Sequence, residues 1–300
     1  MNFHLVFPLL SSLLFVGAML AIKRATAFRI GVWRMTFVAN ATTALLMLAL
    51  LPFGGNPIDL ATLWQPLVIA VLFIGGQSCT FWALEKGDVS VATPTMGIKT
   101  LMVGWLSVLF LSVDLSWQLW TSAGISVAAV GLLSASPSKN AKPNQAPAYS
   151  VWKTVAIALL AALSFSAFDV TIQKWSPEWG VGRLLPITFI LAALLSLCFV
   201  PFFSAPLSQI PRSAAPWLAS GAFLMALQAL SLVTAIGIWG DATSMNVVYS
   251  ARGLWSVAAV WLIGHWFDNR ERALGARTLK LRLAGAFAMT VAIVIAFIGE

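Results

Sequence analysis

Two positively charged side chains lie deep inside long apolar stretches of this 300-residue sequence. Lys99 follows Asp88 of a Gly-Asp pair by eleven residues, and Arg252 follows Asp241 of a second Gly-Asp pair by the same distance. A buried ammonium or guanidinium group is costly unless a protein carboxylate, backbone carbonyls or an anionic ligand satisfies it. Asp169 is the one clearly internal carboxylate and cannot neutralise both cations. The residue types therefore predict a site for a carboxylate or a phosphate group.

Aromatic, hydroxyl and amide side chains share helix faces with the two cations, because residues three or four positions apart are neighbours on a helix. These neighbours are Thr95 near Lys99, and Tyr249, Trp255 and, one turn further, Asn246 near Arg252. An aromatic, hydroxyl-rich wall around a cation suits an organic anion or an amino acid. We assign the six residues to a predicted substrate site, with ordinary helix packing as the alternative for each neighbour.

Asp169 has two roles open to it. Carboxylates inside transporters often carry the coupling proton, so Asp169 is a candidate proton site. The alternative is an ion pair with Lys99 or Arg252. Asp88 and Asp241 differ, because both precede predicted helices, where an Asp caps free N–H groups and favours the helix dipole.

The elements around these residues belong to a membrane protein. Hydrophobic residues make up 60% of the chain and charged residues 9%, against about 25% charged in ordinary globular proteins. This excludes a soluble enzyme, a disordered chain and a nucleic-acid reader, because the net charge of +8 is scattered between apolar runs. Cys79 and Cys198 lie far apart, and His4 and His265 stand alone. The sequence therefore predicts no metal site and no cofactor.

Ten stretches reach the roughly 20 apolar residues that a bilayer-spanning helix needs. They cover residues 3–22, 33–52, 63–84, 89–112, 117–135, 152–173, 183–203, 214–238, 242–265 and 281–299. Lys99 and Arg252 lie about ten residues into the fourth and ninth stretches, roughly 15 Å deep at 1.5 Å per residue. The fold class is predicted to be all-α integral membrane with ten transmembrane helices.

The two halves of the chain repeat each other. Residues 31–53 read GVWR, nine residues, then ALLMLALLPF, and residues 180–202 read GVGR, nine residues, then ALLSLCFVPF. We predict a first five-helix repeat at 1–135, a polar Pro-rich linker at 136–150 and a second repeat at 151–300. An odd number of helices per half inverts the second half in the membrane. Inverted repeats are typical of alternating access around a site near mid-membrane.

This pattern resembles the drug/metabolite transporter superfamily, EamA type. The resemblance rests on the ten stretches, the inverted halves, Arg34 and Arg183 opening the second and seventh helices, and Gly124 and Gly285 in the fifth and tenth. It implies an inner-membrane secondary transporter, frequently an exporter of amino acids or metabolites.

The sequence departs from the family at two positions, because Asp114 and Asp268 stand where the family usually has Gly-Glu. The central cations are also similar to those of phosphate- and organic-anion-handling relatives, in which cations of the fourth and ninth helices meet the substrate. Helix one has no acidic residue, unlike that of the small cationic-drug relatives.

The orientation in the membrane has two opposing indications. Fourteen Lys and Arg residues fall on the side of connections 1–2, 3–4, 5–6, 7–8 and 9–10, and two on the opposite side. The positive-inside rule then places both termini outside. The family resemblance implies that both lie in the cytoplasm.

We therefore predict a secondary transporter, an exporter by resemblance, that carries a small organic anion, an amino acid or a related metabolite. Its expected partners are the substrate, the lipid bilayer and protons, with no nucleic acid. The alternatives are a non-transporting scaffold or lipid-binding protein, and an intramembrane enzyme.

Overall fold

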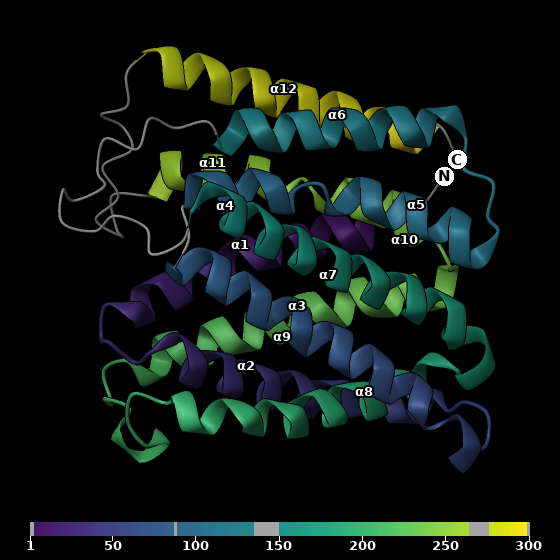
Figure 1. Cartoon of the computed structure of the whole chain (residues 1–300), viewed down its shortest axis with the longest axis vertical. Helices are drawn as coiled ribbons and strands as arrows, with labels where there is room; N and C mark the ends of the chain where they lie inside the picture. The colour runs from purple at the N-terminus through teal and green to yellow at the C-terminus, as the bar shows by residue number, and fades with distance from the viewer. Residues whose placement is uncertain (1–2, 87–88, 135–149, 264–275, 299–300) are drawn as a thin grey trace. The chain divides into compact units, whose positions relative to one another are not determined.

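The computed structural model describes residues 3–86, 89–134, 150–263 and 276–298, which form helices and loops and no β-strand. The α-helices (Figure 1) are α1 (Val6–Thr26), α2 (Val32–Met47), α3 (Trp64–Lys86), α4 (Val89–Met96), α5 (Lys99–Leu111), α6 (Trp117–Ser134), α7 (Val151–Trp179), α8 (Val181–Leu195), α9 (Ala215–Trp239), α10 (Ala242–Tyr249), α11 (Arg252–Ile263) and α12 (Ala276–Ile298). Short 3₁₀ segments cover Phe3–Leu5, Leu48–Phe53, Leu60–Thr62, Ser196–Phe202 and Leu207–Gln209.

Each of the ten predicted stretches is helical, which confirms the predicted fold class. Seven of the described helices are long and apolar enough to cross a membrane. The fifth stretch is the shorter apolar helix α6. The remaining two, the fourth and the ninth, differ from the prediction because each consists of two helices.

The breaks in these two stretches fall directly before the central cations. α4 ends at Met96 and α5 begins at Lys99, while α10 ends at Tyr249 and α11 begins at Arg252. The backbone tightens at both breaks, where Ile98 N–H donates to the Thr95 carbonyl at 3.2 Å and Ala251 N–H to the Val248 carbonyl at 3.0 Å. These i to i−3 bonds replace the α-helical pattern locally. Each cation is therefore the first residue of a half-helix.

The chain divides into two compact units, which do not coincide with the two halves of the sequence. One unit contains Met1–Leu5, Gly75–Val170 and Ala242–Glu300, and the other contains Val6–Ile74 and Thr171–Asp241. Each unit combines helices of both halves. The division at 1–135 and 151–300 stays a prediction about duplication, and the linker at 136–150 lies outside the described residues except for Ser150.

Equivalent helices of the two halves run antiparallel in the first unit. Leu133 and Ala129 near the end of α6 pack with Met289 of α12, and Ala123 near its start packs with Ala296. α6 and α12 lie side by side along their length, as Figure 1 shows in teal and yellow. The repeats are thus inverted, as the odd helix count predicts.

The second unit shows the same inversion in α2 and α8. Gly31 and Gly180 precede these helices with nearly equal backbone angles, φ 86° and ψ 139° against φ 74° and ψ 141°. Gly31 lies against Ser204 beyond α8, and Gly182 lies against Gly54 beyond α2. The GVWR and GVGR motifs are therefore matching helix starts at opposite ends of an antiparallel pair.

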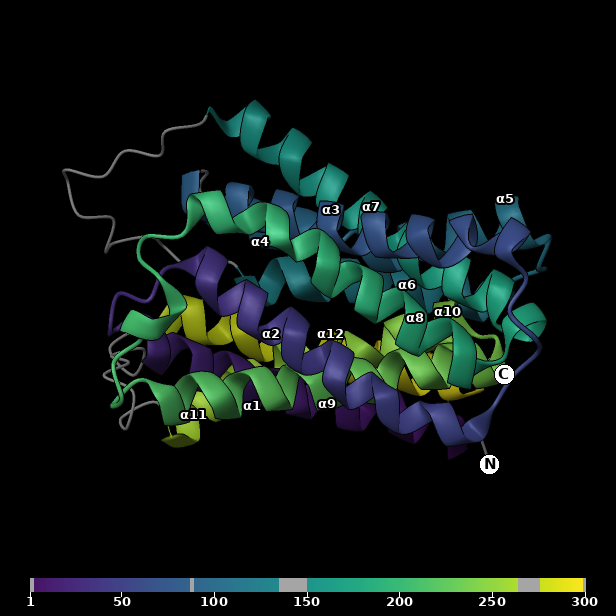
Figure 2. The same ribbon diagram turned by 90° about the horizontal axis from the view of Figure 1, so that it is seen from below.

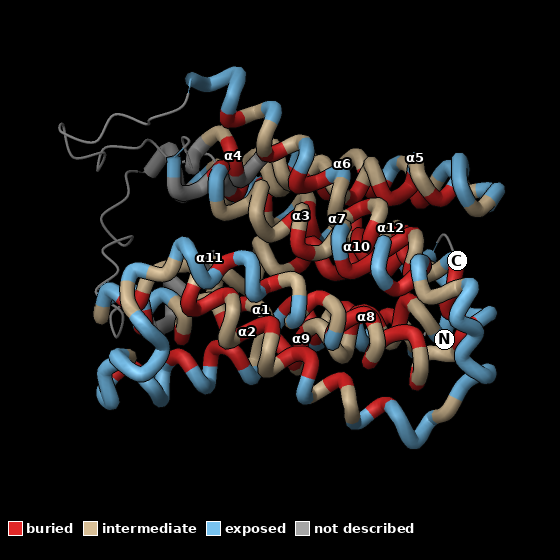
Figure 3. Tube along the Cα trace, turned by 60° about the horizontal axis from the view of Figure 1, so that its bottom comes forward, coloured by how far each residue is buried: buried red, intermediate tan, exposed pale blue. Residues whose placement is uncertain are grey.

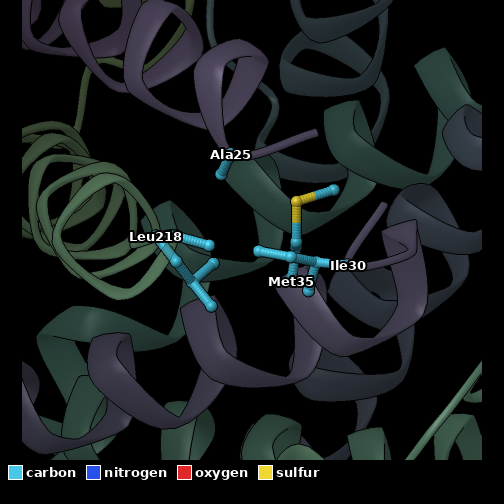
Figure 4. Packing of buried hydrophobic residues seen from close by; sticks show 5 residues of the cluster. Ala25, Ile30, Met35 and Leu218 are labelled. Carbon is cyan, nitrogen blue, oxygen red and sulfur yellow. The ribbon is translucent and has the colours of Figure 1, made fainter. Parts of the chain in front are cut away.

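α1 and α9 form the other close pair of the second unit, seen side by side in Figure 2. Ser11 of α1 donates to the Gln228 carbonyl of α9 at 2.9 Å. At one end of the pair a buried apolar cluster of Ala25, Ile30, Met35 and Leu218 joins α1, α2 and α9 (Figure 4). Small residues, interhelical hydrogen bonds and apolar packing hold helices together where lipid supplies no hydrophobic drive.

Gly182 tests the packing of α2 against α8. An added Cβ would lie 2.5 Å from the Gly54 carbonyl oxygen and 2.6 Å from that of Leu50. Gly182→Ala should destabilise the protein by about 2 kcal/mol, because backbone atoms cannot yield as side chains do. The measurement is the midpoint of thermal unfolding in detergent.

Gly124 of α6 supplies the matched control, because nothing lies within 4 Å of a Cβ added there. Gly124→Ala should unfold at the wild-type temperature or above it. Equal midpoints for the two variants would contradict the proposed close approach.

Candidate functional site

A buried ion pair joins two elements of the first unit. The Lys99 ammonium at the start of α5 lies 2.8 Å from Oδ2 of Asp169 on α7. The Lys99 side chain is 14% exposed and that of Asp169 is 2% exposed. Of the two roles left open for Asp169, the structure shows the ion pair and identifies Lys99 as its partner. Such a pair is strongly coupled, because losing either partner strands a buried charge.

Asn246 of α10 completes the environment of the carboxylate. Its amide Nδ2 donates to Oδ2 of Asp169 at 2.8 Å and to the Ala242 carbonyl at 2.8 Å. An amide nitrogen has two hydrogens, and both are used here. Asn246 therefore holds Asp169 and the backbone of its own helix, and its contact with a substrate stays a prediction.

α10 carries Asn246 in a fully buried helix. All eight of its residues are buried, as the red segment in Figure 3 shows. Two hydroxyl contacts fix α10 against α5: Thr100 Oγ1 and Ser250 Oγ are 3.1 Å apart, and Thr243 donates to Ser107 at 3.4 Å. Residue numbers rise along α5 as they fall along α10 in these two contacts, so the helices are antiparallel. Buried hydroxyl pairs of this kind hold helices together inside a membrane.

Each central cation also faces an aromatic ring. The Arg252 guanidinium carbon lies 4.7 Å from the centroid of the Tyr249 ring, and the Lys99 ammonium lies 5.8 Å from that of Phe165. A cation over a ring gains about 0.5–2 kcal/mol, with the larger value where water is excluded. Tyr249 was predicted from the sequence. Phe165 was missed, although its position four residues before Asp169 places both on one face of α7.

The other two predicted site residues lie at the edges of this arrangement. Thr95 is in the last turn of α4, where its hydroxyl donates to the Val91 carbonyl at 2.7 Å. Trp255 is half-buried in the first turn of α11. The contacts established around the ion pair therefore come from α5, α7 and α10, and the assignment of Thr95 and Trp255 to a substrate site stays a prediction.

The serine preceding Asp169 on α7 also reaches the first helix break. Ser166 donates to the Ala162 carbonyl at 2.7 Å and approaches the Lys99 carbonyl at 3.2 Å. The Lys99 carbonyl belongs to the first turn of α5, so this hydroxyl ties α7 to the start of that half-helix. α7 therefore meets Lys99 through both the side chain and the backbone.

The predicted capping and signature residues fall elsewhere. Asp241 stands immediately before α10, whereas Asp88 and Asp268 lie outside the described residues. Arg34 is buried in the second unit, where its guanidinium donates to Ser204 at 3.1 Å and to the Pro206 carbonyl at 3.3 Å. Arg34 therefore ties the start of α2 to the loop after α8 and takes no part in the ion-pair site.

A hollow of about 480 Å³ lies on the first unit between Trp105 of α5 and Trp120 of α6. Its wall is mostly apolar, and Asp114 is its one lining acid. The side chain of Trp105 is 67% exposed, as expected for a ring that faces lipid. Lys99 and Asp169 do not line this hollow. The charged cluster of Lys99, Asp169 and Arg252 therefore makes the better candidate site.

Comparison with known proteins agrees with this architecture. Residues 2–135 match the model of the EamA-like transporter family. A crystal structure that shares 16% sequence identity superposes with a TM-score of 0.72 over 98% of this chain and 96% of that chain. No curated protein matches the sequence. The resemblance to the EamA-type transporters is thereby confirmed in sequence over residues 2–135, and nearly the whole chain shares its fold with a solved structure.

The ion pair can be tested by removing its members in turn. Lys99→Met should destabilise the protein by about 3 kcal/mol, because the Asp169 carboxylate then stays buried without a cation. Adding Asp169→Asn should recover part of the loss, because the second change removes the stranded charge. The measurement is a double-mutant cycle of unfolding free energies in detergent. Additive losses would show that the two groups do not interact.

Proposed function

We propose that this protein is a secondary transporter, not an enzyme, that moves a small organic anion, an amino acid or a related metabolite by alternating access. The observation that carries the proposal is the pair of equivalent helix breaks, each followed by a half-buried cation. Broken helices with ionisable groups at their ends are the usual construction of substrate sites in inverted-repeat transporters. The EamA-like match supports a membrane transporter of the drug/metabolite type.

The charges of the cluster favour a substrate with one carboxylate. Lys99, Arg252 and Asp169 together carry one excess positive charge. A carboxylate brings one negative charge to these two cations, whereas a phosphate dianion brings two into a medium of low dielectric constant. Aromatic rings at Tyr249 and Phe165 suit an apolar body attached to the carboxylate.

The predicted location is the inner membrane of the cell, and we propose both termini outside. The support is the excess of Lys and Arg on one side of the ten helices. We further propose that the physiological direction is out of the cell, so that the protein acts as an exporter.

Arg252 provides the first functional test. The purified protein is screened by thermal shift against the L-amino acids, lactate, benzoate and glycerol 3-phosphate, and those that stabilise it are used in uptake assays with liposomes. We expect carboxylates to stabilise it more than the phosphate ester. Arg252→Gln should lower uptake at least about tenfold, because a charge-assisted hydrogen bond contributes about 1.5–3 kcal/mol.

Lys174, an exposed cation on α7, supplies the control. Lys174→Gln should transport as the wild type does, since it changes the net charge by the same amount away from the cluster. Wild-type uptake by Arg252→Gln at equal expression would contradict the site assignment.

The orientation is tested separately with alkaline phosphatase fused to either terminus. Both fusions should be active, because the enzyme folds only outside the cytoplasm and the charge bias places both ends there. Inactive fusions that are expressed at normal levels would indicate the opposite orientation.

A further inference from the structure

We propose that Asp169 is the binding site of a coupling proton and that Asn246 positions it. In the empty transporter the Asp169 carboxylate forms the ion pair with the Lys99 ammonium that a substrate carboxylate would otherwise form. This inference rests on the proposed function, since it concerns the substrate that Lys99 would bind.

The contacts of Asp169 are those that a bound carboxylate would make. Its Oδ2 accepts from the Lys99 ammonium and from the Asn246 amide, both at 2.8 Å. The Asp169 side chain is 2% exposed, so its carboxylate is solvated by these two donors. A substrate carboxylate that reaches Lys99 must therefore share the ammonium with Asp169 or displace it.

Two carboxylates cannot share one buried cation while both stay charged. Like charges a few ångströms apart at low dielectric constant repel strongly, and one of them takes a proton. A proton on Asp169 cancels its attraction to Lys99, so the ammonium is released to the substrate. One proton and one carboxylate then enter together, and the total charge of the cluster is the same empty and loaded.

The groups around Asp169 fit this exchange. Lys99 faces it from α5 and Asn246 from α10. The other titratable groups at the ends of α10 and at the start of α11 are Asp241, Tyr249 and Arg252. Asn246 donates to Oδ2 and so favours the charged carboxylate. Because its second N–H is held by the Ala242 carbonyl, the amide has a fixed direction.

Protonation of Asp169 would also weaken the contacts that hold the half-helices α5 and α10 together through α7. Asp169 of α7 links Lys99 at the start of α5 to Asn246 of α10 through a single oxygen atom. Protonation weakens both links at once. Proton and substrate are therefore bound on the same side and cross in the same direction, which makes the transporter a symporter that can also release an accumulated acid.

The experiment compares the wild type, Asp169→Asn and Asp114→Asn in liposomes that contain a trapped pH-sensitive dye. The probe is the member of the carboxylate panel (L-amino acids, lactate or benzoate) with the largest thermal shift. We expect uptake of the probe to be accompanied by protons in liposomes with the wild type. Asp114→Asn is the control, because Asp114 is exposed, and it should behave as the wild type does. Asp169→Asn should exchange labelled for unlabelled probe but lose the proton movement completely.

Three results separate the proposals. Uptake by the wild type without proton movement, as expected if a substrate ammonium faced Asp169, would overturn the inference and leave the proposed function standing. Proton movement by Asp169→Asn equal to that of the wild type would overturn it as well. No uptake of any probe by the wild type would overturn the proposed function, and the inference with it.

Asn246→Ala gives a second readout that keeps Asp169 in place. Without the amide the charged carboxylate loses a donor, so it takes its proton at higher pH. Proton-coupled uptake should therefore extend to higher pH than in the wild type, with the maximal rate retained. An unchanged pH profile would contradict the positioning role of Asn246.

Discussion

The arrangement of the first unit depends on one buried ion pair. An ammonium group inside a membrane is costly unless it is solvated by protein, and Lys99 meets this requirement with Asp169 at 2.8 Å. The requirement then extends outward, because a buried carboxylate needs its own donors and receives one from Asn246. Asn246 in turn lies on a helix that is buried on all sides. One charge thus constrains α5, α7 and α10 together.

The predicted duplication supplies two cations, whereas among the described residues only Asp169 forms an ion pair with one of them. Arg34 and Arg183 are 149 residues apart, and Lys99 and Arg252 are 153 apart. Subtracting these offsets from 169 places the counterpart of Asp169 at residues 16–20, which read VGAML. α1 contains no acid at all. With one acid to two cations, the excess positive charge arises where the second half differs from the first, and the proposed anion would bind to this excess.

The sequence alone predicts the helices well and the site only partly. All ten stretches were found because an apolar run of bilayer length is a strong signal. The breaks at 97–98 and 250–251 were missed, since hydrophobicity continues unchanged through them. The partner of Asp169 could not be chosen between Lys99 and Arg252, because contacts between helices depend on rotation and register. Asn246 was selected for its position near Arg252, but its contact to Asp169 crosses from α10 to α7.

The contact between α5 and α10 has a hydroxyl pair that the equivalent positions of α4 and α11 lack. Thr100 and Ser250 meet at 3.1 Å between α5 and α10. Applying the offset of 153 residues, their counterparts are Gly253 and Gly97, which have no hydroxyl groups. The equivalent face between α4 and α11 therefore has no such bond to form at these positions. Under the proposed alternating access, in which the two repeats move against each other, this hydroxyl pair would stabilise one of the two states more than the other. That state has α5 packed on α10, as observed here.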